Sequence, residues 1–506
     1  MPKDNSMSNS LTVLAIFSLA LVGRLLFLFL VSGLGYNGWY HDSYHHWQIA
    51  YYTLHVGLKQ VPPRMWDLNG MEYFWGLLPT LTESLLLWVF NTTSMVPFRV
   101  FNSIMGSLSA CLISLLGRRH FGRRVGLFAG VLATLSPVLW EVDSSGMLDP
   151  MGIALLLAAL YMYERSPFVC GILLGLASLT HIEFWFLALA VCGFYIAFEK
   201  SSIKFIPSIL GWLIPMVPYF WFMQTRTGDW LYALKWNYLG SIKGEWISNV
   251  QVPFEAQMVP RAVAIGFFVV SVASILYLLK KKQKIYPIHA FFLTFIAMQG
   301  VVFGATAYVV PYIAFYQIGR LFLDRLFALN YYYIAVLAPV AIEVISRSQM
   351  RSRPPFRIDA KRWTGLLLAA VVALNLSLFP YTTQQYFSET YYGPYRGQIE
   401  IADAIVANYR GGTVVSSLVI VNYRLINGEI LAENVLGSIY CPKDNIREAY
   451  AWLMKHNVTW IIADENMVER FPSLASGQNS PPFYVSVFPI LYRVNQTEIK
   501  NLSERL

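Results

Sequence analysis

The densest group of reactive side chains follows the first long apolar run. The stretch GWYHDSYHHWQ, residues 38–48, holds Asp42 and three of the eight histidines. From Asp42 onward the spacing is helical, which places His45 and His46 on the same side as the carboxylate. This set suits a general base oriented by imidazoles. Two alternatives remain: a divalent metal site of Asp42, His45 and His46, and a plain N-cap beside histidines that reach lipid headgroups.

Acids, imidazoles and guanidiniums also lie at the ends of later apolar runs. WEVDSSGMLDP (140–150) is rich in acids, THIEFW (180–185) holds a histidine and a glutamate, and GRLFLDRLF (319–327) holds two arginines. Ionisable groups are costly to keep near hydrocarbon, so they are functional candidates. The candidates are Glu141, Asp143, Asp149, His181, Glu183, Arg320 and Arg325.

Each acidic candidate also has a structural interpretation. Asp149 precedes a proline at the start of an apolar run, as expected of an acid that begins a helix and is stabilised by its dipole. Asp143 equally suits a solvated loop, and His181 with Glu183 suits a paired helix–helix turn. The functional interpretation requires these residues to meet at one membrane face.

The two arginines have a similar pair of interpretations. Arg320 and Arg325 flank Asp324 in the sequence, so they suit an ion pair with that acid or with lipid phosphates. The alternative is that one of them binds a substrate phosphate, because the planar guanidinium matches phosphate geometry.

The composition requires a polytopic α-helical membrane protein. Of the 506 residues, 56% are hydrophobic and only 13% are charged, which no soluble arrangement hides. Residues 11–35 hold a single charge, Arg24, and exceed the roughly 20 residues that cross a bilayer. Their length excludes a cleaved signal peptide. Further apolar runs bring the prediction to about eleven membrane helices: 98–117, 125–141, 150–163, 168–180, 184–198, 204–223, 262–279, 287–310, 326–346 and 363–380.

Charge predicts the orientation of these helices. Basic residues cluster in alternate loops, most clearly RRHFGRR (118–124), KKKQK (280–284) and 347–362, and positively charged loops are cytoplasmic. An odd number of crossings from a cytoplasmic N-terminus leaves residues 381–506 outside, in an extracytoplasmic or lumenal space. The net charge of +9 is therefore a topology signal and does not indicate nucleic-acid binding.

Two segments of the outer loops are expected to be juxtamembrane helices, near 42–58 and 71–90. The second is long enough to span the membrane but contains Glu72, Pro79 and Glu83. Counting it as a crossing would also move the basic loop RRHFGRR outside. We therefore predict an interfacial helix that lies on the outer leaflet.

Residues 381–506 are predicted to form a small extracytoplasmic α/β domain after a transmembrane catalytic domain of residues 1–380. QIEIADAIVANYR and DNIREAYAWLMKH have helical spacing, whereas TVVSSLVIV, VTWIIAD and FYVSVFPILYRV are predicted strands. Cys441 is the one cysteine in this stretch, so a disulfide framework within it is excluded.

From residue 10 to about 200 the layout resembles the GT-C type glycosyltransferases, particularly the protein O-mannosyltransferases and the aminoarabinose transferases. The features are the acid Asp42 soon after the first membrane helix, RVFNSIMGSLSACLISLLGRRHFGRRVGLFAGVLATLSP, an acidic turn ending in LDPMGIALLL, and GILLGLASLTHIEFW. The small outer α/β domain is similar to theirs as well. Two positions depart from the family: Asp42 stands alone where paired acids are frequent, and His181 stands where a lysine is frequent.

The resemblance implies an inverting transferase with a polyprenyl-phosphate sugar as donor and a hydroxyl of a protein, glycan or lipid as acceptor. The lipid phosphate leaves without protonation, so a base and a cation suffice. Asp42 would be the base and Arg325 or Arg320 the cation, while Asp149, Asp143 and the histidines would orient sugar or acceptor. No cofactor is required; a divalent metal is the alternative.

Two other functions were weighed against this one. DSYHHW is also similar to the first-loop acid and aromatics of oligosaccharyltransferase catalytic subunits, although the tail lacks their Trp-Trp-Asp-Tyr-Gly signature. A solute transporter or flippase is the rival from another class. Transporters place ionisable groups near the midplane and often contain internal repeats, whereas here these groups lie at helix ends, which favours the enzyme.

The predicted topology can be checked with introduced cysteines. Cysteine at Ser94 and cysteine at Ser388 should both react with an impermeant maleimide added from outside, because both positions are predicted to be extracytoplasmic. Labelling of intact cells or right-side-out vesicles measures this. Reaction at Ser388 without reaction at Ser94 would show that the number of crossings between them is wrong.

Overall fold

The computed structural model describes residues 6–31, 41–56, 76–197, 202–237, 328–349, 360–377 and 389–505, with the single positions 294, 379 and 380. The chain forms two compact units. Unit 1 comprises Met1–Ser32, Phe74–Pro79 and Phe98–Gln384, and unit 2 comprises Gly33–Tyr73, Thr80–Pro97 and Gln385–Leu506. Helix α2, His41–Val56, therefore belongs to the same unit as the C-terminal residues.

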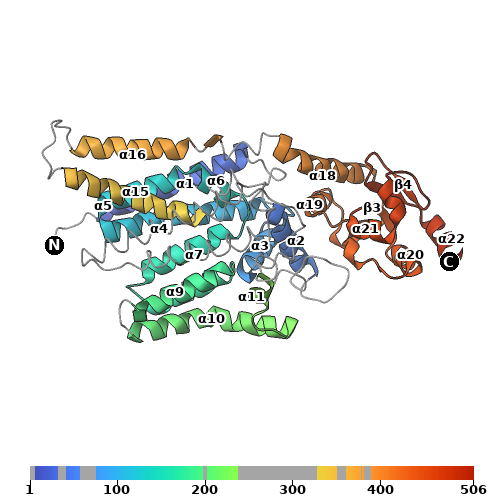
Figure 1. The fold of residues 1–506 in the computed structure, drawn as a ribbon, viewed down its shortest axis with the longest axis horizontal. Helices are drawn as coiled ribbons and strands as arrows, with labels where there is room; N and C mark the ends of the chain where they lie inside the picture. Colours follow the sequence, from blue (N-terminus) through green and yellow to red (C-terminus); the bar gives the residue numbers. More distant parts are fainter. Residues whose placement is uncertain are drawn as a thin grey trace, which may run out of the picture. The chain divides into compact units, whose positions relative to one another are not determined.

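Unit 1 consists of apolar helices that lie side by side (Figure 1). Their buried faces are lined by leucine, alanine and glycine, as expected where one helix packs closely on the next. The elements are α1 Ser6–Leu26 with the π-helical turn η1 Phe27–Val31, α4 Val96–Phe121, α5 Arg123–Thr134, α6 Pro137–Ser144, α7 Asp149–Met162, α8 Pro167–Ser178, α9 Glu183–Ala197, α10 Ser202–Thr227, α11 Tyr232–Asn237, α15 Ala328–Gln349 and α16 Ala360–Leu376.

Most of the predicted membrane runs coincide with these helices. Three helices in the described part have the length and hydropathy to cross a membrane, namely Ser10–Val31, Val96–Phe121 and Ser202–Thr227, and a bent pair raises this to four. Shorter apolar helices include α7, α8 and α9. The runs 262–279 and 287–310 lie outside the described residues, so the count of eleven crossings stays a prediction.

The run 125–141 differs from the prediction because it is two helices, α5 and α6, bent by 61°. Pro137 is the first residue of α6, and the preceding Ser136 is extended, as the proline ring requires. The break leaves carbonyls of α5 without helical partners. Trp140 Nε1 donates to Thr134 O over 2.6 Å, and Asn375 of α16 donates to two carbonyls near the break.

Helices α8 and α10 approach closely because they meet at glycines. A Cβ atom at Gly171 would lie 1.9 Å from Ser208 O, and one at Gly211 would lie 2.3 Å from Phe168 O. No side chain fits at either position, which is typical of small-residue contacts between membrane helices. Trp212 Nε1 donates to Ser178 Oγ over 3.0 Å beside this contact.

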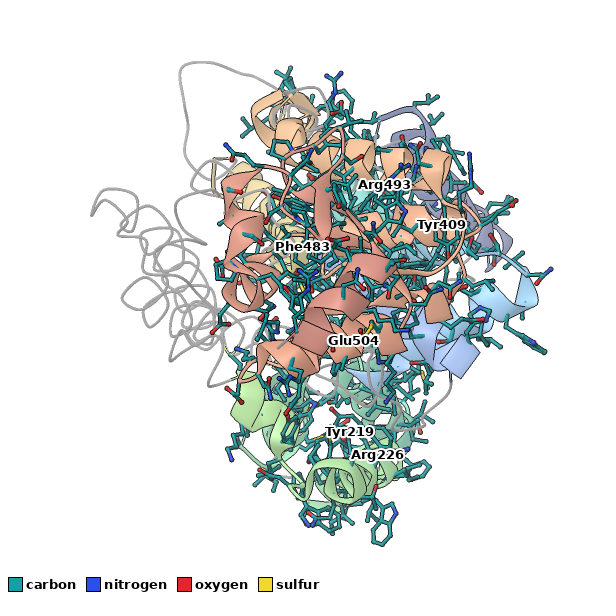
Figure 2. The ribbon with its side chains drawn as sticks, turned by 90° about the vertical axis from the view of Figure 1, so that its right-hand side faces the viewer. Tyr219, Arg226, Tyr409, Phe483, Arg493 and Glu504 are labelled. Atoms are coloured by element: carbon teal, nitrogen blue, oxygen red, sulfur yellow. The ribbon has the colours of Figure 1, made fainter. Side chains whose placement is uncertain are left out.

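Unit 2 contains a five-stranded sheet with the order β2-β1-β3-β5-β4. Strands β2, β1 and β3 are parallel, and β5 and β4 are antiparallel to their neighbours; Figure 2 labels Phe483 of β4 and Arg493 of β5. The elements after residue 389 are α18 Glu389–Asn408, β1 Thr413–Val415, α19 Val419–Asn427, η5 Ala432–Asn434, β2 Val435–Leu436, η6 Ser438–Tyr440, α20 Ile446–Lys455, β3 Val458–Ile462, α21 Glu465–Arg470, η7 Pro472–Ser476, β4 Phe483–Val485, β5 Leu491–Val494 and α22 Gln496–Arg505.

The two faces of the sheet are covered by different helices. Val414 and Ile462 pack with residues of α18 and α19, whereas Val415 and Ile461 pack with residues of α20 and α22. This alternation follows the two-residue period of a strand. The predicted helices 398–410 and 444–456 lie in α18 and α20, and the predicted strand in VTWIIAD is β3.

The segment TVVSSLVIV was predicted to be one strand, and this is wrong after its third residue. Strand β1 ends at Val415, the Leu418 amide donates to Ser416 Oγ over 3.2 Å, and α19 begins at Val419. The reason is that α19 is buried on opposite sides. A short apolar run of this kind does not distinguish a buried helix from a buried strand.

Helix α3, Leu77–Val89, has one buried side and one open apolar side. Glu83 and Ser84 are buried, whereas Leu85 is 54% and Trp88 67% exposed. Large apolar side chains on an open face suit contact with lipid. That this helix lies on the outer leaflet stays a prediction.

Glu83 generates a prediction about stability. The side chain is 1% exposed, and within the described part of the chain its Oε2 atom accepts no hydrogen bond. Burial raises the pKa of the Glu83 carboxyl well above its usual range. The neutral acid therefore favours the folded state at low pH, and this stability is lost as pH rises towards the folded-state pKa.

Glu83→Gln keeps the shape without the ionisable group. The variant should match the wild type in unfolding temperature near pH 5 and exceed it increasingly towards pH 8, as measured by thermal unfolding in detergent. A constant difference across this range would contradict a buried neutral carboxyl. Glu504→Gln, at an exposed position of α22, is the control and should follow the wild type at every pH.

Candidate active site

Asp42 lies in the first turn of α2, His41–Val56. The sequence predicted it as the N-cap, and the helix begins one residue earlier. The carboxylate still lies where unpaired amide groups and the helix dipole favour negative charge. Its side chain is half-buried, as is that of His45, whereas His46 is buried. The structure thus presents a partly accessible acid with two imidazoles one turn further on.

Helix α2 is fixed within unit 2 by α3 and by the turn that follows α3. Ser84 Oγ donates to Ala50 O over 2.8 Å, and Trp47 Nε1 donates to Thr93 O over 2.8 Å. Trp47 also stacks on Tyr51, with ring centroids 5.2 Å apart. The helix that carries Asp42 is therefore held at its later turns, by a backbone carbonyl and by the Trp47 side chain.

The metal alternative finds no support among the residues that the structure describes. No three histidine, cysteine, aspartate or glutamate side chains come together there in an arrangement that holds a metal ion. Asp42, His45 and His46 are all described, so their helical spacing does not by itself create a three-ligand site.

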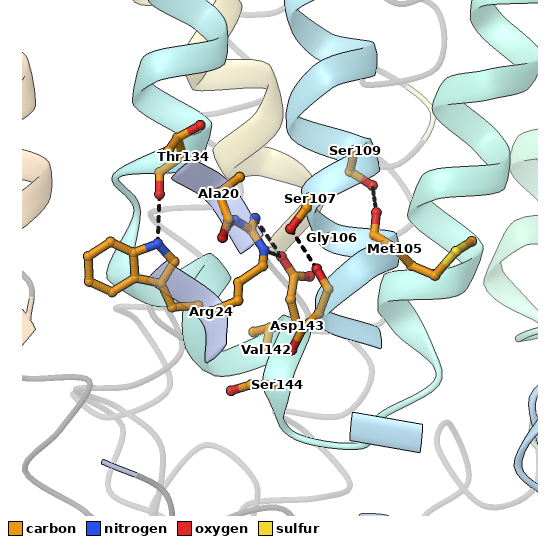
Figure 3. A network of polar contacts seen from close by, with 12 residues as sticks. Ala20, Arg24, Met105, Gly106, Ser107, Ser109, Thr134, Val142, Asp143 and Ser144 are labelled. Carbon is orange, nitrogen blue, oxygen red and sulfur yellow. Dashed lines mark hydrogen bonds and ion pairs between the residues drawn. The ribbon is translucent and has the colours of Figure 1, made fainter. Parts of the chain in front are cut away.

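Asp143 in unit 1 takes part in a buried ion pair (Figure 3). Arg24 of α1 approaches its Oδ2 atom through Nη2 at 2.7 Å and donates to the same oxygen through Nε at 2.8 Å. Tyr332 of α15 donates to Oδ2 over 3.4 Å. Both charged side chains are buried. Asp143 therefore neutralises the guanidinium on the first membrane helix, a structural task that the loop interpretation missed.

The acidic turn between α6 and α7 is fixed from α4. Arg99 Nε donates to Ser144 O and Asn102 Nδ2 donates to Met147 O, each over 2.7 Å. Asp149 follows this turn as the first residue of α7 and is half-buried. Its position matches the predicted helix start, and the residue as a whole is less buried than Asp143.

The turn with His181 and Glu183 lies against the start of α7. A Cβ atom at Gly152, in the first turn of α7, would lie 2.4 Å from both Thr180 Oγ1 and Phe184. These two residues flank His181 and Glu183, which are both half-buried. The structure therefore brings the second and third predicted groups of polar residues to the same end of the unit 1 helices. Glu141 is buried one turn before the acidic turn.

The role of two candidate residues stays a prediction, and the sequence did not indicate the structural role of three others. Arg320 and Arg325 lie outside the described residues. Arg24 was recognised from the sequence only as a lone charge, although a single arginine in an apolar helix itself signals a buried acidic partner. The carbonyl-binding Arg99 and Asn102 carried no recognisable signal, because polar residues in a long helix do not reveal which turn they reach.

The comparison with known proteins rests on structure. No family model and no curated protein matches the sequence. ArnT from Cupriavidus metallidurans bound to undecaprenyl phosphate is similar with a TM-score of 0.55 and 13% identity, over 95% of this chain and 97% of that chain. Its apo state gives 0.54 and 14%, over 97% and 99%.

The oligosaccharyltransferase of Archaeoglobus fulgidus in its apo form is also similar in fold. The TM-score is 0.51 with 15% identity, over 89% of this chain and 69% of that chain. At these identities the comparison shows the fold alone. The fold is therefore similar to those of ArnT and of the archaeal oligosaccharyltransferase.

The Arg24–Asp143 pair generates a prediction about packing. A Cβ atom at Gly106 of α4 would lie 2.1 Å from Asp143 Oδ2 and 2.2 Å from its Cγ. Gly106→Ala should therefore displace the carboxylate and destabilise the protein by about 1–3 kcal/mol, the usual cost of overpacking. Thermal unfolding in detergent measures the effect.

Gly193→Ala in α9 is the matched control. No atom lies within 4 Å of a Cβ atom built there, and alanine is the better helix former. This variant should unfold at or above the wild-type temperature. Equal stability of the two variants would show that Gly106 does not confine Asp143.

Proposed function

We propose that this protein is a membrane glycosyltransferase that moves a sugar from a polyprenyl-phosphate donor to an acceptor hydroxyl. The observation that supports it most is the fold likeness to ArnT, which extends over nearly the whole of both chains. ArnT is described with undecaprenyl phosphate bound. The half-buried Asp42 at the start of α2 supplies a carboxylate that the reaction needs.

The proposed reaction is a direct displacement at the anomeric carbon. Asp42 takes the proton of the acceptor hydroxyl, the hydroxyl oxygen forms a bond to C1, and the bond from C1 to the phosphate oxygen breaks. The electron pair of that bond leaves with the polyprenyl phosphate. Configuration at C1 inverts because attack and departure occur on opposite faces. The leaving phosphate is already a weak base and needs no proton, so one positioned base is enough.

The remaining candidates have supporting roles in this proposal. His45 and His46 keep the Asp42 carboxylate oriented, and Arg325, or Arg320 as second choice, stabilises the departing phosphate. Asp149 is the better second carboxylate, since its side chain is half-buried at a helix start.

His181 and Glu183 are proposed to contact sugar or acceptor, because their turn packs against the start of α7. Asp143 is proposed to have a structural role, as the buried partner of Arg24, and no role in proton transfer. Its Oδ2 atom is occupied by Arg24, which leaves it poorly placed to take a proton.

The location of the site follows the predicted topology. We place Asp42, the acidic turn and residues 381–506 on the extracytoplasmic or lumenal side, where α3 rests on the outer leaflet. The exposed Leu85 and Trp88 of α3 support this placement. About eleven membrane helices, from a cytoplasmic N-terminus, are part of the same proposal.

Oligosaccharyl transfer is the second candidate, favoured by the fold likeness to the Archaeoglobus fulgidus enzyme. The two candidates differ in the donor glycan and in the acceptor. A hydroxyl acceptor and a single sugar indicate the first function, whereas a preassembled oligosaccharide transferred to a peptide indicates the second.

The test is release of the lipid. Purified protein incubated with a panel of polyprenyl-phosphate sugars should release free polyprenyl phosphate from one donor, as detected by mass spectrometry. Asp42→Asn keeps the size and polarity of the side chain but removes the basic lone pair, so turnover should fall by roughly 10²-fold or more.

The matched control is Asp444→Asn, the same exchange at an exposed position before α20. It should keep wild-type turnover. Near-normal turnover in Asp42→Asn would exclude Asp42 as the base, and Asp149 would replace it. Vesicle transport of a labelled solute without release from any donor would instead support the transporter class.

A further inference from the structure

The C-terminal residues contact the helix that carries Asp42 through a buried polar pair. Asn422 of α19 donates through Nδ2 to Gln48 Oε1 of α2 over 3.0 Å. Gln48 is 1% and Asn422 3% exposed. The two amides are the buried polar link between segments that are 374 residues apart in the sequence, and both lie within unit 2.

Aromatic side chains also join α2 to α19. Tyr423 contacts Trp47 edge-on with ring centroids 4.6 Å apart, and Tyr44 with centroids 5.3 Å apart. Ile420 and Ile426 belong to the same buried cluster. Aromatic contacts are tolerant of small rotations, whereas the single hydrogen bond from Asn422 Nδ2 to Gln48 Oε1 is directional, and breaking it would leave a buried donor and a buried acceptor without each other.

Helix α19 is itself fixed to the sheet on its other side. Val421 and Leu425 pack with Val414 of β1 and Ile462 of β3. Its last turn is fixed as well, since Thr93 Oγ1 donates to Asn427 Oδ1 over 2.9 Å. The helix therefore forms a rigid connection from the sheet to α2.

We infer that the Gln48–Asn422 pair is a positioning contact: it sets the rotation of α2 and thereby the place of the Asp42 carboxylate. This inference rests on the proposed function, in which Asp42 is the base. Gln48 and Asn422 act in this inference through the position of α2, and no contact with substrate is assigned to them. Their role is to select one register of α2 on α19, as a single buried polar contact does in coiled coils.

The size of the effect follows from helix geometry. Side chains extend about 5–6 Å from a helix axis, so a rotation of α2 by roughly 10° moves the Asp42 carboxylate by about 1 Å. A misplacement of about 1 Å costs on the order of 10²-fold in rate. Loss of the pair should therefore lower kcat by about 10- to 100-fold and leave the KM for the donor nearly unchanged.

The test uses the full-length protein with two single variants and the double variant. Gln48→Met and Asn422→Leu each leave one buried amide without its partner, so both should lower the unfolding temperature and kcat. Gln48→Met/Asn422→Leu removes both polar groups, and replacing both partners by apolar groups is nearly neutral for stability. Its unfolding temperature should return towards the wild type while kcat stays low.

The double variant separates positioning from plain stability. Recovery of kcat together with the unfolding temperature would overturn the inference, as would wild-type kcat in either single variant. Leu453→Ala, in the core on the α20 side of the sheet, is the control. It should lower the unfolding temperature without lowering the kcat of the folded protein.

Hydrogen exchange tests the contact without any turnover. Backbone amides of α2 should exchange faster in the double variant than in the wild type, and they should be unchanged in Leu453→Ala. If no donor is turned over by the wild type, the proposed function fails and this measurement still decides whether the pair holds α2. Unchanged exchange of α2 in the double variant would overturn the positioning role.

Discussion

A charged group on an apolar helix must be neutralised before that helix can be buried, and the ion pair between Arg24 and Asp143 meets this requirement in unit 1. Its effect extends beyond the two residues. Asp143 lies in α6. The axis of α6 is bent by 61° from that of α5, because Pro137 interrupts the helix between them. Without this interruption Asp143 would lie on a straight continuation of α5. The bend, the hydrogen bonds to the carbonyls near it and the ion pair therefore depend on one another.

The turn between α6 and α7 is fixed by contacts from α4 and α1. Arg99 and Asn102 donate to carbonyls on either side of Gly146, while Asp143 just before the turn is held by Arg24. Asp149 therefore begins α7 at a defined place, and the turn at His181 packs against that start. Buried ion pairs add little net stability against an apolar alternative. The contribution of the Arg24–Asp143 pair is instead to fix the end of α6, from which the turn to Asp149 starts.

In unit 2 a polar pair and aromatic contacts, rather than an ion pair, fix the helix that carries a candidate carboxylate. The sheet holds α19, and α19 holds α2 through the Gln48–Asn422 pair and the rings of Tyr44, Trp47 and Tyr423. Asp42 is thereby supported by residues from the far end of the chain. In the proposed function the C-terminal α/β fold therefore helps to position Asp42, through its packing on α2.

The sequence by itself determined the membrane class, most helix positions and the candidate Asp42. The length of an apolar run shows whether a helix can cross the hydrocarbon core, and helical spacing shows which residues lie on the same face of a helix. These are local properties. The tertiary structure was needed to show that TVVSSLVIV turns from strand into α19, that Asp143 pairs with Arg24, and that α2 packs on the C-terminal residues. Such outcomes depend on contacts between residues 119 to 374 positions apart, which no local pattern contains.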